Sequence, residues 1–125
     1  MTTLLDTGVV VDHLRGVERA TEFLVTTLAN GDAACSRLTM VELAVGMRPH
    51  QEPEFSRLLQ FVDIIEVDGQ IGQRAEQLAR TWGRSHAAID VTDYVIAATA
   101  DLRQFTLATC NVKHFPMFEG LTAPY

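Results

Sequence analysis

Short apolar segments alternate with longer amphipathic segments along the whole 125-residue chain. Strands separated by helices pair in parallel through right-handed crossovers, so this order favours an α/β protein. We therefore expect a three-layer α/β/α sandwich with a mainly parallel central sheet. Short apolar runs predict strands at residues 4–6, 33–35, 64–67 and 105–109. Apolar residues at helical spacing predict helices at 9–14, 17–28, 39–47, 53–62, 71–82 and 91–102.

The composition is typical of one globular domain, which we expect to span residues 1–125. Apolar residues make up 47% of the chain and charged residues 21%, with no repeat or low-complexity tract. No apolar run approaches the roughly 20 residues that cross a bilayer, and the N-terminus lacks the features of a secretory signal. Cys35 and Cys110 are far apart and have no metal-type spacing. We therefore expect a cytoplasmic protein with reduced thiols and no membrane association.

The charge balance limits the nucleic-acid-binding modes that are open to this chain. The net charge is −6, and the only cations are nine arginines and Lys113. Coating nucleic acid through a basic surface requires clustered cations, so this balance argues against it. It does not exclude an enzyme that acts on phosphates, because metal ions held by carboxylates reverse the local charge.

Three acidic residues interrupt the most apolar segments of the chain. They are Asp6, Glu42 and Asp93. An ionised carboxylate without a partner in such surroundings costs several kcal/mol, so each must be paired, protonated, solvated or bound to a metal. No lysine or arginine lies within four residues of Glu42 or Asp93. A shared metal cation is the simplest explanation for all three acids.

Helix capping explains the same acids without a metal. Thr39 and Glu42 have the spacing of a capping box with Thr39 as N-cap, and Asp90 and Asp93 have a similar one. Asp6 could belong to a simple turn over residues 6–8. The two explanations are compatible, because an acid in the first turn of a helix can stabilise that terminus and also face the crevice at the strand ends.

Four segments in this order resemble the PIN-domain ribonucleases, in particular the VapC toxins of prokaryotic toxin–antitoxin pairs. They are LLDTGVVVDHLRG, SRLTMVELAVGM, DVTDYVIAATADL and LATCNVKHFPMF, and the resemblance covers nearly the whole chain. It implies that Asp6, Glu42 and Asp93 match the three most constant carboxylates of the family. Thr7 matches the small hydroxyl residue that follows the first acid.

The chain departs from the family pattern at the fourth acidic position. The family often has an acid in a T-x-D element, whereas Asn111 follows Thr109 here, as in the T-x-N variants. An amide oxygen can bind Mg²⁺ but contributes no charge, so the departure puts a second metal site in doubt. Asp90 is either a partial replacement or a helix cap, and His114 stands near a position that is often acidic. Thr7 and Thr109 are candidates for supporting the metal site or for turn roles.

The resemblance implies a Mg²⁺- or Mn²⁺-dependent endoribonuclease toxin with Asp6, Glu42 and Asp93 as catalytic metal ligands. A metal-activated water would attack an RNA phosphodiester and leave 5′-phosphate and 3′-hydroxyl ends. The resemblance also implies a homodimer, inhibition by a cognate antitoxin, and possible assembly into larger toxin–antitoxin complexes. Met40, Leu43 and Met47 could offer the antitoxin an apolar groove, although ordinary core packing explains them equally well.

Two other functions fit parts of the pattern. The first is a noncatalytic PIN-like module that binds RNA or protein, with Asn111 as the sign of a weakened metal site. The second is a phosphotransfer domain that uses Asp6 as nucleophile. The phosphotransfer function lacks support, because no second acid stands two residues after Asp6 and no lysine partner is recognisable.

Overall fold

The centre of the protein is a sheet of four parallel strands in the order β3-β2-β1-β4. The computed structural model describes residues 1–125. Its strands are β1 (Thr2–Leu5), β2 (Asp32–Ser36), β3 (Val62–Ile65) and β4 (Thr106–Ala108). Its α-helices are α1 (Thr7–Leu14), α2 (Glu18–Asn30), α3 (Arg37–Gly46), α4 (Glu52–Leu59), α5 (Gly69–Trp82) and α6 (Val91–Arg103). Short 3₁₀ turns occur at Pro49–Gln51 and Val112–His114.

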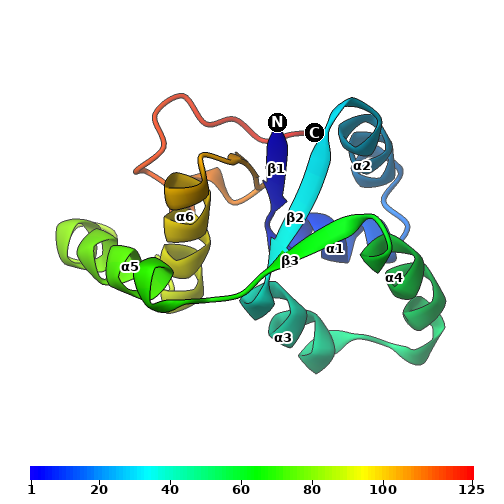
Figure 1. The fold of residues 1–125 in the computed structure, drawn as a ribbon, viewed down its shortest axis with the longest axis horizontal. Helices are drawn as coiled ribbons and strands as arrows, with labels where there is room; N and C mark the ends of the chain where they lie inside the picture. Colours follow the sequence, from blue (N-terminus) through cyan, green and yellow to red (C-terminus); the bar gives the residue numbers. More distant parts are fainter.

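Helices cover both faces of the sheet. Helices α5 and α6 lie on one side, α1, α2 and α4 lie on the other, and α3 lies at the carboxyl ends of the strands (Figure 1). Successive strand residues face opposite sides, so Leu4 packs in the cluster under α5 and α6, whereas Leu5 packs with residues of α1 and α2. The expected three-layer sandwich with a parallel sheet is confirmed.

The strand order creates a crevice between two neighbouring strands. The chain runs outward from β1 through β2 to β3, and β4 then returns to the opposite side of β1. The strand order therefore reverses between β1 and β4, and the carboxyl ends of two such neighbouring strands border a crevice in open parallel sheets. Asp6 directly follows β1 and Thr109 directly follows β4, so both lie at this switch point.

Helices α1 and α3 each begin two residues earlier than the sequence pattern predicts. The predicted turn at residues 6–8 is wrong, because Asp6 is the N-cap of α1 and the helix starts at Thr7. The predicted capping role of Thr39 is also wrong, because the Ser36 hydroxyl accepts a hydrogen bond from the Leu38 N–H (3.1 Å) and caps α3. A hydroxyl that comes directly after the strand satisfies the free N–H groups first.

Other boundaries differ by a few residues. Helix α4 ends at Leu59 instead of residue 62, because Val62 pairs with Ala33 in the sheet. The expected arrangement at the start of α6 is confirmed: Asp90 is the N-cap, and its N–H donates to the Asp93 carboxylate (3.0 Å). None of the helices combines the length and apolar character that crossing a membrane requires.

Candidate active site

Asp6 is the central acid of the crevice and is held from both sides. Its Oδ1 accepts a hydrogen bond from the Thr7 N–H (2.9 Å), and its Oδ2 accepts one from the Thr109 hydroxyl (2.7 Å). Asp6 is buried at 9% relative exposure, and Thr109 is fully buried. The carboxylate is therefore fixed by the first turn of α1 and by the segment that follows β4.

Glu42 is linked to this centre through Thr7. The Thr7 hydroxyl donates to Glu42 Oε1 (2.6 Å) and lies 3.1 Å from the hydroxyl of Thr39, which is fully buried in α3. Thr39 therefore helps to join the first turns of α1 and α3 instead of capping a helix. Glu42 keeps its second carboxylate oxygen free of hydrogen bonds.

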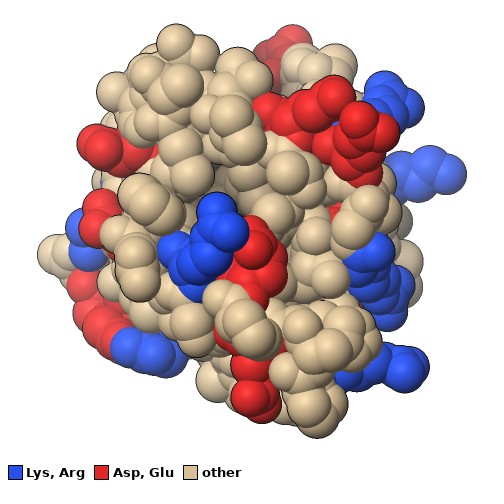
Figure 2. Space-filling view, turned by 90° about the vertical axis from the view of Figure 1, so that its right-hand side faces the viewer, with Lys and Arg blue, Asp and Glu red and all other residues tan.

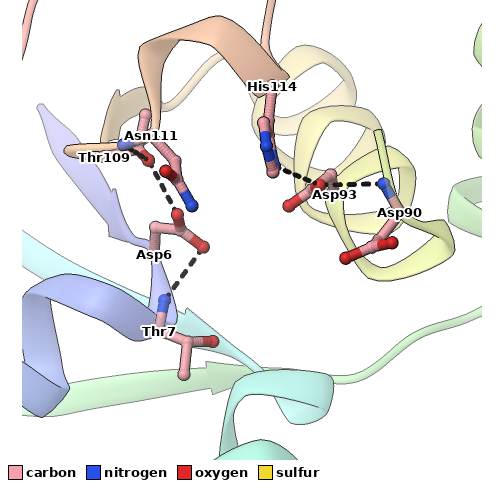
Figure 3. Close-up of polar contacts among 7 residues, drawn as sticks. All are labelled: Asp6, Thr7, Asp90, Asp93, Thr109, Asn111 and His114. Carbon is pink, nitrogen blue, oxygen red and sulfur yellow. Dashed lines mark hydrogen bonds and ion pairs between the residues drawn. The ribbon is translucent and has the colours of Figure 1, made fainter. Parts of the chain in front are cut away.

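Asp93 lies in the first turn of α6 and is held by its own helix and by the C-terminal segment. Its Oδ2 accepts the Asp90 N–H and lies 2.9 Å from His114 Nδ1. Oδ1 makes no hydrogen bond. Figure 3 shows the side chains of Asp6 and Asp93 pointing toward the same space, with His114 and Asn111 on one side of it.

Asn111 completes this arrangement through its backbone. Its N–H donates to the Thr109 hydroxyl (3.0 Å), the same hydroxyl that donates to Asp6. The side-chain amide makes no hydrogen bond within the protein and points toward the Asp6 carboxylate (Figure 3). A neutral amide therefore lies where the family pattern often has an acid.

The electrostatics of the crevice are dominated by uncompensated negative charge. The pKa of Asp6 is raised above its ordinary value, mainly because burial removes water from the carboxylate. Hydrogen bonds from Thr109 and Thr7 oppose this shift, whereas the negative charges of Asp93 and Glu42 raise the pKa further. No lysine or arginine forms an ion pair with these three acids. The protein therefore places no lysine or arginine charge against these acids, and the basic side chain in contact with one of them is His114, beside Asp93.

The donor chemistry fits a hard divalent cation. Carboxylate and amide oxygens are the ligands that Mg²⁺ and Mn²⁺ prefer, and no cysteine takes part in the hydrogen bonds of the crevice. No three His, Cys, Asp or Glu side chains converge closely enough to form a complete metal site. A cation at these acids would therefore need water molecules or substrate oxygens as additional ligands.

The structure brings most of the predicted residues together. Hydrogen bonds connect Asp6, Thr7, Glu42, Thr109 and Asn111, and Asp93 is close enough for its charge to affect Asp6. The exposed Asp90 side chain lies beside Asp93 but makes no hydrogen bond with the other site residues.

Sequence reasoning missed the contacts of two residues. The sequence pattern predicts a helix-capping role for Thr39, whereas its hydroxyl contacts that of Thr7. The pattern gives no indication of the contact between His114 and Asp93. Each contacts a residue more than 20 positions away in the chain, so local spacing gave no signal for either contact.

The chain is similar to known proteins over nearly its whole length. The model of the PIN domain family matches residues 3–116. Ribonuclease VapC10 of Mycobacterium tuberculosis is 43% identical, with alignment over 98% of this chain and 92% of that protein. Ribonuclease VapC19 of the same organism is 41% identical over 98% of each chain. A chain in a toxin–antitoxin complex from Klebsiella pneumoniae superposes with a TM-score of 0.82 at 29% identity, covering 98% of each chain. This chain therefore belongs to the PIN domain family and, within it, to the VapC ribonucleases.

Proposed function

We propose that this protein is a metal-dependent endoribonuclease toxin that a cognate antitoxin holds inactive. The observation that carries the proposal is that Asp6, Glu42 and Asp93 line one crevice and that no lysine or arginine pairs with them. RNA is the proposed substrate, since the curated relatives are ribonucleases. We expect products with 5′-phosphate and 3′-hydroxyl ends.

Mg²⁺ or Mn²⁺ is the proposed cofactor, and Asp6, Glu42 and Asp93 would hold it as ligands, directly or through water molecules. When bound, such an ion supplies an activated water and stabilises negative charge on the phosphate. The protein's own contribution is to hold the carboxylates in place. Thr7 and Thr109 orient Asp6 and Thr7 also orients Glu42, while the free oxygens of Glu42 and Asp93 remain available. We propose Asn111 as an additional neutral ligand.

The proposed protein partner is an antitoxin. The Klebsiella pneumoniae relative was solved as a toxin–antitoxin complex, and this chain matches it over almost its whole length. A homodimer, a larger toxin–antitoxin assembly, a cytoplasmic location and the treatment of residues 1–125 as a single domain stay predictions.

A noncatalytic binding module is the second candidate function. It is favoured by the neutral Asn111 and by the absence of a complete set of direct metal ligands. Such a module would bind RNA or protein without cutting it, whichever divalent ion is supplied.

Cleavage of total RNA by the purified protein tests the two functions. We expect cleavage with Mg²⁺ or Mn²⁺, none after chelation, and none in Asp93→Asn with an unchanged circular dichroism spectrum. Sequencing the 5′ ends of the products would identify the target. RNA binding without cleavage in any divalent ion would reject the ribonuclease proposal and favour the binding module.

A further inference from the structure

A groove leads away from Glu42 toward the turn that joins α3 to α4. Its part nearest the acids is lined by Glu42 and by Val11, Leu43 and Met47, among others. Its outer part reaches His50. The two parts share four lining residues, which makes them one continuous depression; these residues are Leu14, Arg15, Arg48 and Gln51.

Gln51 fixes the position of both arginines. Its side-chain amide N–H donates to the Leu14 carbonyl at the end of α1 (3.4 Å), and its amide oxygen accepts the Arg48 N–H (2.9 Å). Arg15 is the C-cap of α1, and Arg48 precedes the 3₁₀ turn at Pro49–Gln51. One side chain therefore holds together the two backbone segments that carry the arginines, and it does so without using either guanidinium.

The two guanidinium groups are free to bind an anion. Arg15 and Arg48 form no ion pair, whereas four other arginines do; these are Arg37, Arg57, Arg74 and Arg80. The face drawn in Figure 2 carries acidic and basic side chains in small separate groups, without one broad basic field. Arg19, Arg84 and Arg103 also form no ion pair, so the feature that distinguishes Arg15 and Arg48 is that both line one groove beside Glu42.

The groove suits a nucleotide strand better than a lone anion. Arginine forks match phosphate oxygens, and the apolar side chains of Val11, Leu14, Leu43 and Met47 can contact a base or ribose. Arg15 follows Asp6 by nine residues across helix α1, so it lies roughly 13 Å from Asp6 along the helix axis.

We propose that this groove is a binding subsite for single-stranded RNA, in which Arg15 and Arg48 contact backbone phosphates flanking the scissile one. The proposal rests on the proposed ribonuclease function and adds the path of the substrate to it. The phosphate diester to be cut lies at the acids, and the neighbouring nucleotides of the same strand extend along α1 toward the turn after α3.

Binding of a fluorescent single-stranded RNA of mixed sequence tests the proposal. The protein carries Asp6→Asn so that RNA stays intact, and Arg15→Gln/Arg48→Gln is compared with Arg103→Gln. Arg103 is a matched control, because it is exposed, unpaired and also at the C-terminal end of a helix, but precedes β4 at the opposite edge of the sheet. We expect the double variant to weaken RNA binding at least about tenfold, and Arg103→Gln to leave it within about twofold.

The salt dependence separates phosphate contacts from a general loss of structure. Each phosphate contact on a single strand contributes about 0.7 to the magnitude of the slope of log K against the logarithm of the salt concentration. The slope of the double variant should therefore be smaller in magnitude by about 1.4. In the protein with Asp6 intact, the same change should raise KM more than it lowers kcat. Arg15→Lys/Arg48→Lys should recover most of the slope, because lysine keeps the charge.

Three outcomes would overturn the RNA subsite. The first is an unchanged RNA Kd and an unchanged salt slope in the double variant. The second is an equal loss of RNA affinity in Arg103→Gln. The third is a double variant that binds RNA normally but binds the antitoxin less tightly, which would assign the groove to a protein partner. Failure of the proposed function is distinguishable, because the unaltered protein would then show no divalent-dependent cleavage of RNA at all. Melting temperatures of all variants within a few degrees of one another exclude misfolding as the cause.

Discussion

The two best-buried carboxylates of the crevice are held in different ways. Asp6 has both oxygens occupied, and one donor, Thr109, is 103 residues away in the chain. Asp93 has one oxygen occupied, by the backbone of its own helix and by His114, and its side chain is 13% exposed. The position of Asp6 thus depends on the whole fold, whereas that of Asp93 depends mainly on a helix cap. The metal-free protein should respond differently to changes at the two centres.

Asp6→Asn should give the largest effect and separates catalysis from stability. Loss of the central carboxylate should lower kcat for RNA cleavage by at least about a hundredfold to a thousandfold. The free energy of unfolding of the metal-free protein should stay constant or increase, because asparagine is also a good N-cap and the buried charge is removed. Cleavage assays and urea unfolding with a chelator present measure the two quantities.

Asp93→Asn is the matched comparison for that change. It should lower cleavage to a similar extent but give no gain in stability, since the Asp93 carboxylate is more exposed and its charge is favoured in the first turn of α6 beside His114. If Asp6→Asn destabilised the protein and Asp93→Asn did not, Asp6 would be a structural residue and the contrast between the two centres would be reversed.

The alternation of apolar and amphipathic segments was sufficient to predict the fold. It predicted the parallel sheet and all six helices, because each element carries its own periodicity. Helix starts were less predictable. Ser36 and Thr39 both have a hydroxyl suited to capping, and only the end of β2 determines which of them stands at the helix terminus.

The site was predictable only where a residue is unusual in its local sequence. Asp6, Glu42 and Asp93 stand out because they interrupt apolar segments. Thr39 and His114 look ordinary in sequence, and their contacts exist only because the fold joins α1 to α3 and the C-terminal segment to α6. Their roles, and the assignment of the acids as metal ligands, stay predictions that the experiments address.

Removing the side chain that holds each carboxylate, Thr109 for Asp6 and His114 for Asp93, should show more clearly how differently the two acids are held. Thr109→Val leaves the buried Asp6 Oδ2 without a donor, which should cost about 1–3 kcal/mol of stability and about 10- to 100-fold in cleavage. His114→Ala removes the contact that the partly exposed His114 makes with Asp93. It should lower cleavage about tenfold and the free energy of unfolding by less than about 1 kcal/mol. Urea unfolding and kcat measure both.

Thr109→Ser is the control for the first change, because it keeps the hydroxyl, and it should retain most of the activity. Equal losses of stability in Thr109→Val and His114→Ala would show that the two carboxylates are equally embedded in the fold, contrary to the comparison above.

The pH dependence of stability should report Asp6 in particular. A raised folded-state pKa means that the protonated acid stabilises the fold fully below the unfolded value of 3.8, and that this contribution is lost as pH rises through the raised value. The metal-free protein should therefore lose stability relative to Asp6→Asn across that window. The proposed Mg²⁺ would bind the ionised carboxylate, so the increase in melting temperature that it is expected to cause, a few degrees, should grow over the same range.

Melting curves of the two proteins with Mg²⁺ and with chelator, from pH 3 upward, measure this difference. If the melting temperatures of the unaltered protein and Asp6→Asn, measured with chelator, differed by the same amount at every pH, Asp6 would not be a desolvated acid. A Mg²⁺ effect that is as large in Asp6→Asn as in the unaltered protein would place the ion elsewhere.

Asn111→Asp should have the smallest effect and tests whether the neutral amide limits the site. The side chain points toward Asp6, so a new carboxylate there adds like charge to the metal-free crevice and should cost at most about 1 kcal/mol of stability. The same charge should lower the Mn²⁺ concentration for half-maximal cleavage a few-fold, because ligand charge strengthens binding of a hard cation.

Asn111→Ser is the control that removes the amide without adding charge, and it should raise the Mn²⁺ concentration for half-maximal cleavage. If both variants shifted the Mn²⁺ requirement in the same direction, residue 111 would act on the loop after β4 and not on the cation. The difference in how Asp6 and Asp93 are held would then not depend on the charge at residue 111.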